Sequence, residues 1–266
     1  APLDSPFRAK TVTHTASSPA RPVEPPRLAI FKTGDSFADV VAEHGDFEDL
    51  FSARLDGFRR RGGVIEVIDV RRQPLPAISD QDGVMVTGSH AMVSDREAWS
   101  EALKPWLREA LDCGLPMFGV CYGHQLMAEA FGGSAGYHPR GRECGTRTLT
   151  LTEAGRGDPL FGALPDAFAA QLTHAQSALS RPEAATVLAA NDHDPNQALR
   201  YGPAQYSVQF HPEFTVQVTA AYLAHQRDIL VAQDEDVEAL ERSVVETPEA
   251  SSLLDAFALT LFDRRS

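Results

Sequence analysis

A short turn around Cys121 places the strongest constraint on how this chain folds. An apolar run ends in Gly119-Val-Cys-Tyr-Gly123, and a helical pattern begins directly after it. Met117 to Val120 is typical of the end of a buried strand, and the apolar side chains among Gln125 to Ala130 face back onto it. Because a glycine stands two residues before and two residues after the cysteine, the backbone can turn sharply there. The pattern predicts a strand-to-helix elbow with Cys121 at its tip.

An elbow of this kind activates a thiol. Unpaired N–H groups and the helix dipole at a helix N-terminus favour the thiolate, so the pKa of Cys121 should fall below the free value of about 8.5. An isolated cysteine is most often a small buried apolar residue without chemistry. The flanking glycines favour the nucleophile instead.

Composition sets the broad class of protein. The chain has 266 residues, of which 43% are hydrophobic, enough for one sizeable α/β core. Its net charge of −13 argues against nucleic acid or an anionic membrane as the partner. The three cysteines include no CxxC pair, so we expect neither a disulfide framework nor a cysteine-based zinc site. We also expect no other metal and no cofactor. No apolar run is long enough for a membrane span or a signal peptide, and we expect a cytoplasmic protein.

The N-terminal segment differs in composition from the rest. Residues 1–27 are rich in proline, serine and threonine and are expected to form a flexible arm. Residues 28–266 are expected to form one domain, with a helical extension from about residue 215. No internal repeat is present.

The first half of this domain alternates between strands and helices. Strands are expected at residues 28–31, 64–70 and 82–87. Apolar side chains at three- and four-residue spacing predict one amphipathic helix over 47–58. Ser94 and Glu97 have the form of a capping box before a second helix that runs to Leu111. This order of elements favours a parallel sheet.

The second half reads differently. Short strands separated by Gly, Pro, Asn and Asp are expected to pair in antiparallel fashion. They cover residues 147–151, 168–173, 186–190, 197–201 and 206–210. Residues 216–230 and 237–262 are expected to be helical.

His211 is the histidine best placed to serve as a base. It ends the last expected strand, and Pro212 fixes the backbone before Glu213. Because residues two apart on an extended chain point the same way, Glu213 can hold the imidazole and stabilise its charged form. Taken alone, His-Pro-Glu also fits an ordinary surface turn.

Together the two motifs resemble those of the class I glutamine amidotransferases. The glutaminase domains of that family carry G-x-C-x-G-x-Q and later Q-F-H-P-E; this chain has Gly119-Val-Cys-Tyr-Gly-His-Gln125 and Gln209-Phe-His-Pro-Glu213. The resemblance covers about residues 28–214 and is closest to GMP-synthetase-like glutaminase domains and their stand-alone relatives. It implies a doubly wound, three-layer α/β fold of the flavodoxin-like type, with a central, mostly parallel sheet and a small antiparallel extension. It also implies a triad of Cys121, His211 and Glu213 that forms a γ-glutamyl thioester and releases ammonia.

The resemblance also assigns an oxyanion hole. Stabilising a tetrahedral intermediate takes two N–H donors near ~3 Å from the oxyanion. The elbow supplies the N–H of Tyr122. Where the family usually has Gly-Gly, this chain has Gly88-Ser89, and the second role passes to the N–H of Ser89.

Substrate-binding positions follow in the same way. Gln125 matches the family position that helps to hold the glutamine substrate, and Gly88 belongs to the turn beside it. Arg142-Glu-Cys-Gly145 resembles a loop that borders the same pocket. His174 resembles the histidine of a Ser-His or Thr-His pair there, and a structural role suits it equally.

Two departures limit the analogy with complete GMP synthetases. In those enzymes the pair continues with Gly-Asp, whereas Ala175-Gln176 follows His174 here. No ATP-pyrophosphatase domain follows Phe214. We therefore expect no complete GMP synthetase activity.

The sequence leaves three functions open. The first is an independent hydrolase that acts on glutamine or on a γ-glutamyl amide. The second is a glutaminase subunit that passes ammonia to a separate synthetase. The third, a binding or regulatory module without turnover, is disfavoured because all three triad residues are present.

Overall fold

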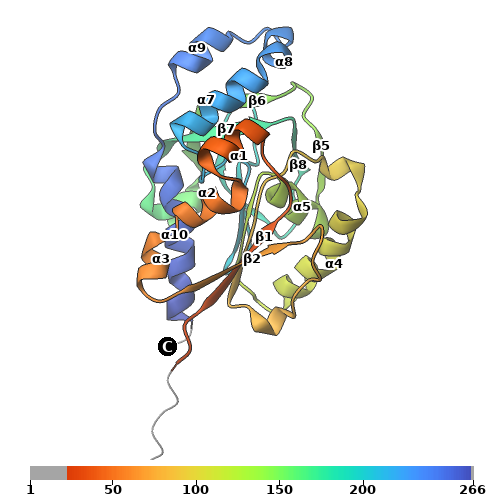
Figure 1. Ribbon diagram of the computed structural model, residues 1–266, viewed down its shortest axis with the longest axis vertical. Coiled ribbons are helices and arrows are strands. Elements are labelled where there is room, and N and C mark those ends of the chain that lie inside the picture. Colours follow the sequence, from red (N-terminus) through yellow and green to blue (C-terminus); the bar gives the residue numbers. More distant parts are fainter. Residues whose placement is uncertain (1–22, 265–266) are drawn as a thin grey trace, which may run out of the picture.

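A nine-stranded mixed sheet forms the centre of the molecule in the computed structural model, which describes residues 23–264 (Figure 1). The strand order is β2-β1-β3-β4-β11-β10-β9-β6-β7. These strands are β1 (Arg27–Lys32), β2 (Val64–Asp69), β3 (Gly83–Val86), β4 (Met117–Val120), β6 (Glu143–Leu151), β7 (Ala167–His174), β9 (Thr186–Ala190), β10 (Ala198–Gly202) and β11 (Gln205–Val208). A separate antiparallel pair joins β5 (Ser134–Tyr137) to β8 (Gln176–Ser180). Most of the expected N-terminal arm, residues 1–22, lies outside the described residues.

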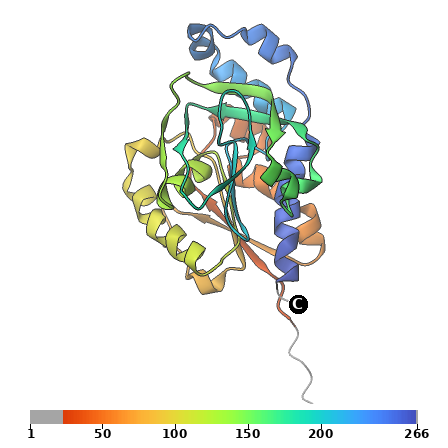
Figure 2. The same ribbon diagram turned by 180° about the vertical axis from the view of Figure 1, so that it is seen from behind.

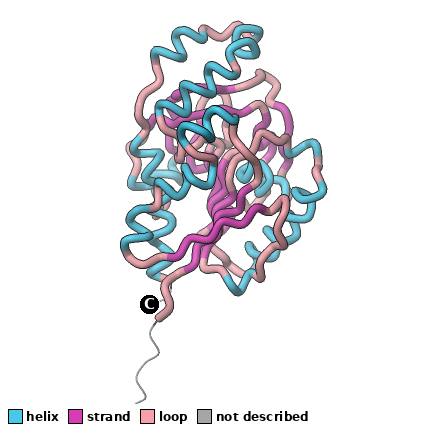
Figure 3. The backbone as a smooth tube through the Cα atoms, in the orientation of Figure 1, coloured by secondary structure: helices cyan, strands magenta, loops and turns pink. Residues whose placement is uncertain are grey.

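The sheet has a parallel half and an antiparallel half. Strands β2, β1, β3, β4 and β11 run parallel to their neighbours, and the pairs from β11 onward to β7 are antiparallel. The backbone tube shows the parallel strands side by side as a twisted stack (Figure 3). The sequence predicted this change of pattern after residue 133.

Helices cover both faces of the sheet. They are α1 (Ala38–His44), α2 (Phe47–Ala53), α3 (Asp56–Arg60), α4 (Ala98–Asp112), α5 (Tyr122–Ala130), α6 (Glu153–Gly157), α7 (Val216–His225), α8 (Arg227–Ala232), α9 (Val237–Arg242) and α10 (Pro248–Asp263). Helices α3 and α10 lie on one face, and α4 and α5 lie on the other, as the front and rear views show (Figures 1 and 2).

Alternation along β1 explains these three layers. Leu28 and Ile30 belong to the apolar cluster that contains α10, whereas Ala29 and Phe31 belong to the cluster that contains α4 and α5. Successive side chains of a strand point to opposite faces, so a strand that is apolar throughout has to be covered on both sides. The expected three-layer α/β fold, with a mostly parallel central sheet and a small antiparallel extension, is confirmed.

Two local predictions about helices in the first half of the domain are wrong. The expected single helix over 47–58 is divided into α2 and α3, with the break at Arg54 and Leu55. The capping box of Ser94 and Glu97 does not form: α4 begins at Ala98 without a side-chain cap. Ser94 instead lies in a short 3-10 turn, and its backbone N–H and hydroxyl both bind the Gln176 side chain.

The helical segment after residue 215 divides into two parts. Helices α8 and α9 lie at the opposite end of the molecule from the C-terminus (Figure 1). Helix α10 starts at Pro248, which breaks the expected 237–262 helix because proline suits the first turn of a helix and not its interior. Leu254 and Phe257 of α10 pack in the main core. No helix in residues 23–264 is long and apolar enough to cross a membrane.

The carboxyl ends of four neighbouring parallel strands meet at one place. Thr33 follows β1, Gly88 lies just after β3, Cys121 follows β4, and His211 lies just after β11. In doubly wound sheets, ligands bind at this edge, where strand order reverses. The fold therefore brings together residues that are far apart in the sequence.

Candidate active site

Cys121 occupies the turn between β4 and α5. Its backbone has φ 52° and ψ −100°, a positive φ that side chains other than glycine rarely adopt. A Cβ on Gly119 would lie 2.5 Å from Met127 Sδ, and a Cβ on Gly123 would lie 2.6 Å from the Val86 carbonyl oxygen. Both glycines are therefore needed for close packing on either side of the elbow, as the sequence indicates.

His211 and Glu213 form a buried pair. The Nδ1 atom of His211 hydrogen-bonds a carboxylate oxygen of Glu213, and the residues are 2% and 1% exposed. The imidazole stacks on Phe214, with ring centroids 4.1 Å apart and an interplanar angle of 18°. The carboxylate and the phenyl ring together fix the orientation of the imidazole.

The thiol and the imidazole change one another's titration. Burial alone would raise the pKa of Cys121, but the charge of His211 and a hydrogen bond to it bring the pKa below its ordinary value. Burial likewise acts to lower the pKa of His211, and the nearby Glu213 carboxylate and Cys121 thiolate raise it to about 10. The lowered pKa of Cys121 and the raised pKa of His211 both favour a thiolate beside an imidazolium.

Gly88 and Ser89 face this pair from the end of β3. A Cβ on Gly88 would lie 2.9 Å from His211 Cε1 and 3.6 Å from Cys121 Cβ, so no larger residue fits without movement. The Thr33 hydroxyl lies 3.0 Å from the Gly88 carbonyl oxygen and holds the turn. Tyr122 is the first residue of α5, so its N–H has no acceptor within the helix. The turn after β3 and the start of α5 thus both border Cys121.

A cavity of about 270 Å³ opens at this edge of the sheet. Its walls include Cys121, His211, Ser89, Tyr122 and Gln125. A larger cavity of about 670 Å³ lies at the other end of the sheet, beside Pro116 and Trp106, and contains none of the expected site residues. The smaller cavity is therefore the one that contains the expected reactive side chains.

Gln125 lines this cavity, and within residues 23–264 its amide oxygen has no hydrogen-bond partner. Its amide nitrogen donates to the Gln176 carbonyl oxygen at 2.7 Å and to Gln209 Oε1 at 3.1 Å. The amide oxygen remains available to accept a hydrogen bond. This arrangement suits the expected substrate-binding role.

His174 is committed to the protein itself. Its Nδ1 lies 2.8 Å from the Gln176 carbonyl oxygen, and its Nε2 lies 2.8 Å from Glu143 Oε1. Although His174 lines the cavity, neither ring nitrogen is left for a substrate. Of the two roles left open by the sequence, these contacts favour the structural one.

Glu143, His174 and His193 have ligand-type atoms within 4.8 Å of one another, a spacing that a metal ion could use. Both carboxylate oxygens of Glu143 already accept hydrogen bonds, from His174 and Gln197 on one oxygen and from Asn191 on the other. Glu143 is therefore fully hydrogen-bonded and ties β6 to the β7–β8 turn, whereas the buried Nε2 of His193 has no partner among the described residues.

Several lining residues could not be found from the motifs. Tyr222 of α7 hydrogen-bonds Ser36 Oγ at 2.7 Å and His90 Nε2 at 2.8 Å, joining three distant segments over the cavity. Phe214 stacks on His211 without lining the cavity, and it gives no signal beyond its place after the His-Pro-Glu motif. His90 directly follows the Gly88-Ser89 turn, and that position was the one available clue to it.

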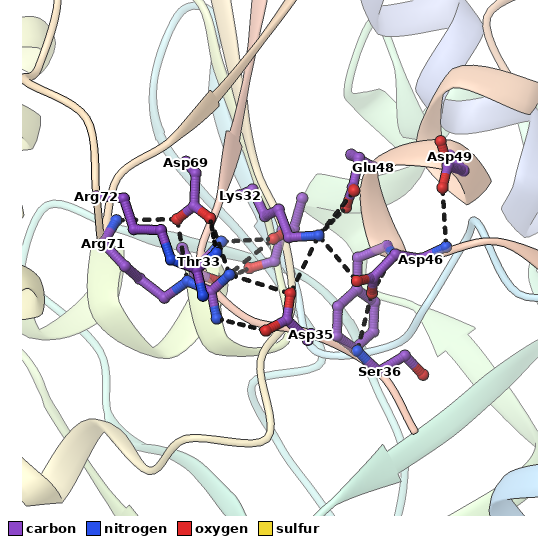
Figure 4. A network of polar contacts seen from close by, with 12 residues as sticks. Lys32, Thr33, Asp35, Ser36, Asp46, Glu48, Asp49, Asp69, Arg71 and Arg72 are labelled. Carbon is purple, nitrogen blue, oxygen red and sulfur yellow. Dashed lines mark hydrogen bonds and ion pairs between the residues drawn. The ribbon is translucent and has the colours of Figure 1, made fainter. Parts of the chain in front are cut away.

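A network of charged side chains fixes the loop after β1 (Figure 4). Lys32 Nζ lies 2.8 Å from Asp46 Oδ2 and 2.7 Å from Glu48 Oε1. Asp46 also accepts a hydrogen bond from the Ser36 N–H at 2.8 Å. Because Ser36 binds Tyr222, this network supports the wall of the cavity.

Comparison with known proteins decides the family. Residues 46–228 match the model of the family "Glutamine amidotransferase class-I". The chain belongs to this family. The prediction of a class I glutamine amidotransferase enzyme is thereby confirmed.

Individual relatives agree with this assignment. This chain is 26% identical over 197 residues to gamma-glutamyl peptidase 5 of Arabidopsis thaliana. The matched region covers 73% of this chain and 78% of that protein. The chain is 30% identical over 175 residues to a glutamine-hydrolyzing GMP synthase subunit of Methanopyrus kandleri, covering 65% and 87%. The fold matches a glutamine amidotransferase from Thermotoga maritima with a TM-score of 0.65, at 20% identity, over 91% and 98% of the two chains.

Proposed function

We propose that this protein hydrolyses the γ-carboxamide of glutamine or a γ-glutamyl amide through a covalent thioester on Cys121. The observation that carries the proposal is the elbow itself: a cysteine at φ 52° faces a buried His211–Glu213 pair across one small cavity. Nucleophile, base and orienting carboxylate are thus the three parts that acyl transfer requires.

In the first half of the reaction, the Cys121 thiolate attacks the γ-carbonyl carbon. The resulting oxyanion accepts hydrogen bonds from the N–H groups of Ser89 and Tyr122. The His211 imidazolium donates its proton to the nitrogen as the C–N bond breaks, releasing ammonia or an amine. A γ-glutamyl thioester remains on Cys121.

In the second half, water attacks the thioester carbonyl. The now neutral His211 accepts a proton from this water, and Glu213 stabilises the imidazolium that forms. The C–S bond breaks, glutamate leaves, and the thiolate–imidazolium pair is restored. No further reactant is needed.

A second function has support from one comparison. The relative from Methanopyrus kandleri is one subunit of its synthase, and this chain is 30% identical to it over 87% of its length. A chain of that kind would pass ammonia to a separate synthetase. The independent hydrolase is favoured because the cavity is already covered from the same chain by Tyr222 of α7 and by Gln226 directly after it.

Glutamate release tests the proposal. Purified protein is incubated with glutamine and with a panel of γ-glutamyl amides and peptides, and Cys121→Ala serves as the blank. We expect release from at least one substrate, abolished by Cys121→Ala with the fold retained. If no substrate is hydrolysed by the protein alone, the independent hydrolase is wrong. Turnover that appears only on adding a synthetase would then support the ammonia-supplying role.

A further inference from the structure

Arg142 carries a guanidinium group that no acidic side chain neutralises. Several other covered cations of this chain have carboxylate partners: Lys104 Nζ lies 2.9 Å from Glu101 and 3.1 Å from Glu129, and Arg71 binds Asp35 and Asp69. For Arg142, residues 23–264 provide no ion pair and no hydrogen bond to the guanidinium. Its Nε is buried and has no partner.

One residue, Gln233, fixes the backbone of Arg142. Its backbone N–H donates to Gln233 Oε1 at 2.8 Å, and its carbonyl oxygen accepts from Gln233 Nε2 at 3.0 Å. The neighbouring Gly141 has φ 83°, and a Cβ there would lie 2.6 Å from Gln233 Oε1. A single amide side chain thus holds both polar groups of the Arg142 backbone, so the guanidinium projects from a fixed base.

Arg142 lines the same cavity as Cys121. Within the described part of the chain, the cavity wall contains Arg142 and four histidines but neither aspartate nor glutamate, although the protein has a net charge of −13. Burial lowers the pKa of Arg142, and the charges of Cys144 and then of Cys121 oppose that effect. An arginine withdrawn from water gains most from a bidentate carboxylate partner.

We propose that Arg142 binds a carboxylate of the substrate and so makes the enzyme selective for γ-glutamyl compounds that present one beside the scissile bond. The identity of the substrate rests on the proposed function; the capture of an anion next to Cys121 does not. Two carboxylates have suitable chemistry: the α-carboxylate of the γ-glutamyl unit and a carboxylate on the leaving amine. Gln233 is the positioning residue that holds Arg142 in place.

Alkylation of Cys121 tests anion binding without any turnover. Iodoacetate and iodoacetamide differ in charge and little in size, so the ratio of their rates at Cys121 reports a cation beside the thiolate. Arg142→Met should lower this ratio by roughly tenfold, the scale of one lost charge-assisted hydrogen bond, with little change in the iodoacetamide rate. Arg142→Lys should retain part of the ratio.

Arg140→Met is the matched control. It removes the same charge from the same loop, but Arg140 is exposed and its guanidinium contacts the backbone carbonyl oxygens of Asp192 and His193. We expect its ratio to equal that of the unmodified protein. An unchanged ratio in Arg142→Met, or an equal loss in Arg140→Met, would overturn the proposal.

Matched substrates then distinguish the two carboxylates. We compare kcat/KM for γ-glutamylglycine, for γ-glutamylglycinamide, which lacks the leaving-group carboxylate, and for 4-aminobutanoylglycine, which lacks the α-carboxylate. If Arg142→Met leaves kcat/KM unchanged for one of these substrates, that substrate lacks the carboxylate that Arg142 binds. An equal loss on all three would overturn carboxylate binding. If none of them is hydrolysed, the proposed function fails, and the alkylation ratio still decides the role of Arg142.

Discussion

Glu143 accepts a hydrogen bond from His174 Nε2 at 2.8 Å, and both side chains are almost wholly buried. The other ring nitrogen of His174 also faces an acceptor, the Gln176 carbonyl oxygen. An imidazole with acceptors at both nitrogens has to carry two protons to satisfy them. Burial opposes charge on both residues, but their pairing raises the pKa of His174 and lowers that of Glu143 to about 2. Both shifts favour the ionised pair, a carboxylate beside an imidazolium.

Replacing Glu143 by glutamine should destabilise the fold by about 3 kcal/mol at pH 7, because it leaves His174 buried without its counter-charge. The sign of the pH dependence follows from the lowered pKa. The ionised carboxyl contributes stability above its ordinary pKa of 4.5 and loses it as the pH falls toward about 2. Urea unfolding should show the deficit of Glu143→Gln shrinking over that range. Glu153→Gln, at an exposed position, is the control, and a deficit independent of pH would contradict the pairing.

His211→Ala should reduce turnover more than Glu213→Gln. The imidazole moves the proton, a contribution of about 10²–10⁴-fold, whereas the carboxylate orients it and stabilises its charge. Phe214 also holds the ring by stacking and continues to do so in Glu213→Gln. Steady-state kinetics of glutamate release provide the measurement. The reverse order would mean that the two roles are misassigned.

Gly88→Ala should lower turnover sharply and stability little. The added methyl would lie 2.9 Å from His211 Cε1, so the imidazole has to move away from Cys121. Gly157→Ala is the matched control, because a Cβ there meets no atom within 4 Å. Kinetics and thermal unfolding of both variants give the comparison. Full activity in Gly88→Ala would show that the ring is not held where the structure has it.

Iodoacetamide should alkylate Cys121 long before Cys144. His211 lowers the pKa of Cys121 below its ordinary value, whereas burial raises the pKa of Cys144 to about 11. The rate at Cys121 should stay high as the pH falls below about 8.5, the pKa of a free thiol. His211→Ala should move that fall to higher pH. Peptide mapping after timed labelling follows both cysteines, and equal rates would exclude an activated thiolate.

The part of the fold that local patterns determine could be read from the sequence. Strands β3 and β4 and residues 28–31 of β1 are apolar and are followed by glycine or polar turns, so the type of these elements was clear. The elbow was clear because the spacing of Gly119 and Gly123 around Cys121 is a local signal, although Gly123 is required by contact with Val86 of β3.

Other features depended on partners that local patterns do not reveal. Ser94 has the form of a cap, but the distant Gln176 binds its backbone N–H and hydroxyl instead. The apolar stripe over 47–58 continues through a break, since Leu55 remains buried although the helix stops. The isolated position of Arg142 also could not be foreseen, because the lack of an acidic neighbour is a property of the packed chain.

The reacting groups and the groups that surround the substrate come from different parts of the molecule. Cys121, Ser89 and His211 follow strands of the parallel sheet, whereas Tyr222 and the Gln233 support of Arg142 belong to a later helical segment that lies over it. Changes in residues 216–236 can therefore redirect which compound enters the cavity while the chemistry at Cys121 stays the same. Sequence differences among related proteins should accordingly concentrate in residues 216–236. Exchanging this segment between two relatives offers a route to new substrate preferences with the reacting residues unchanged.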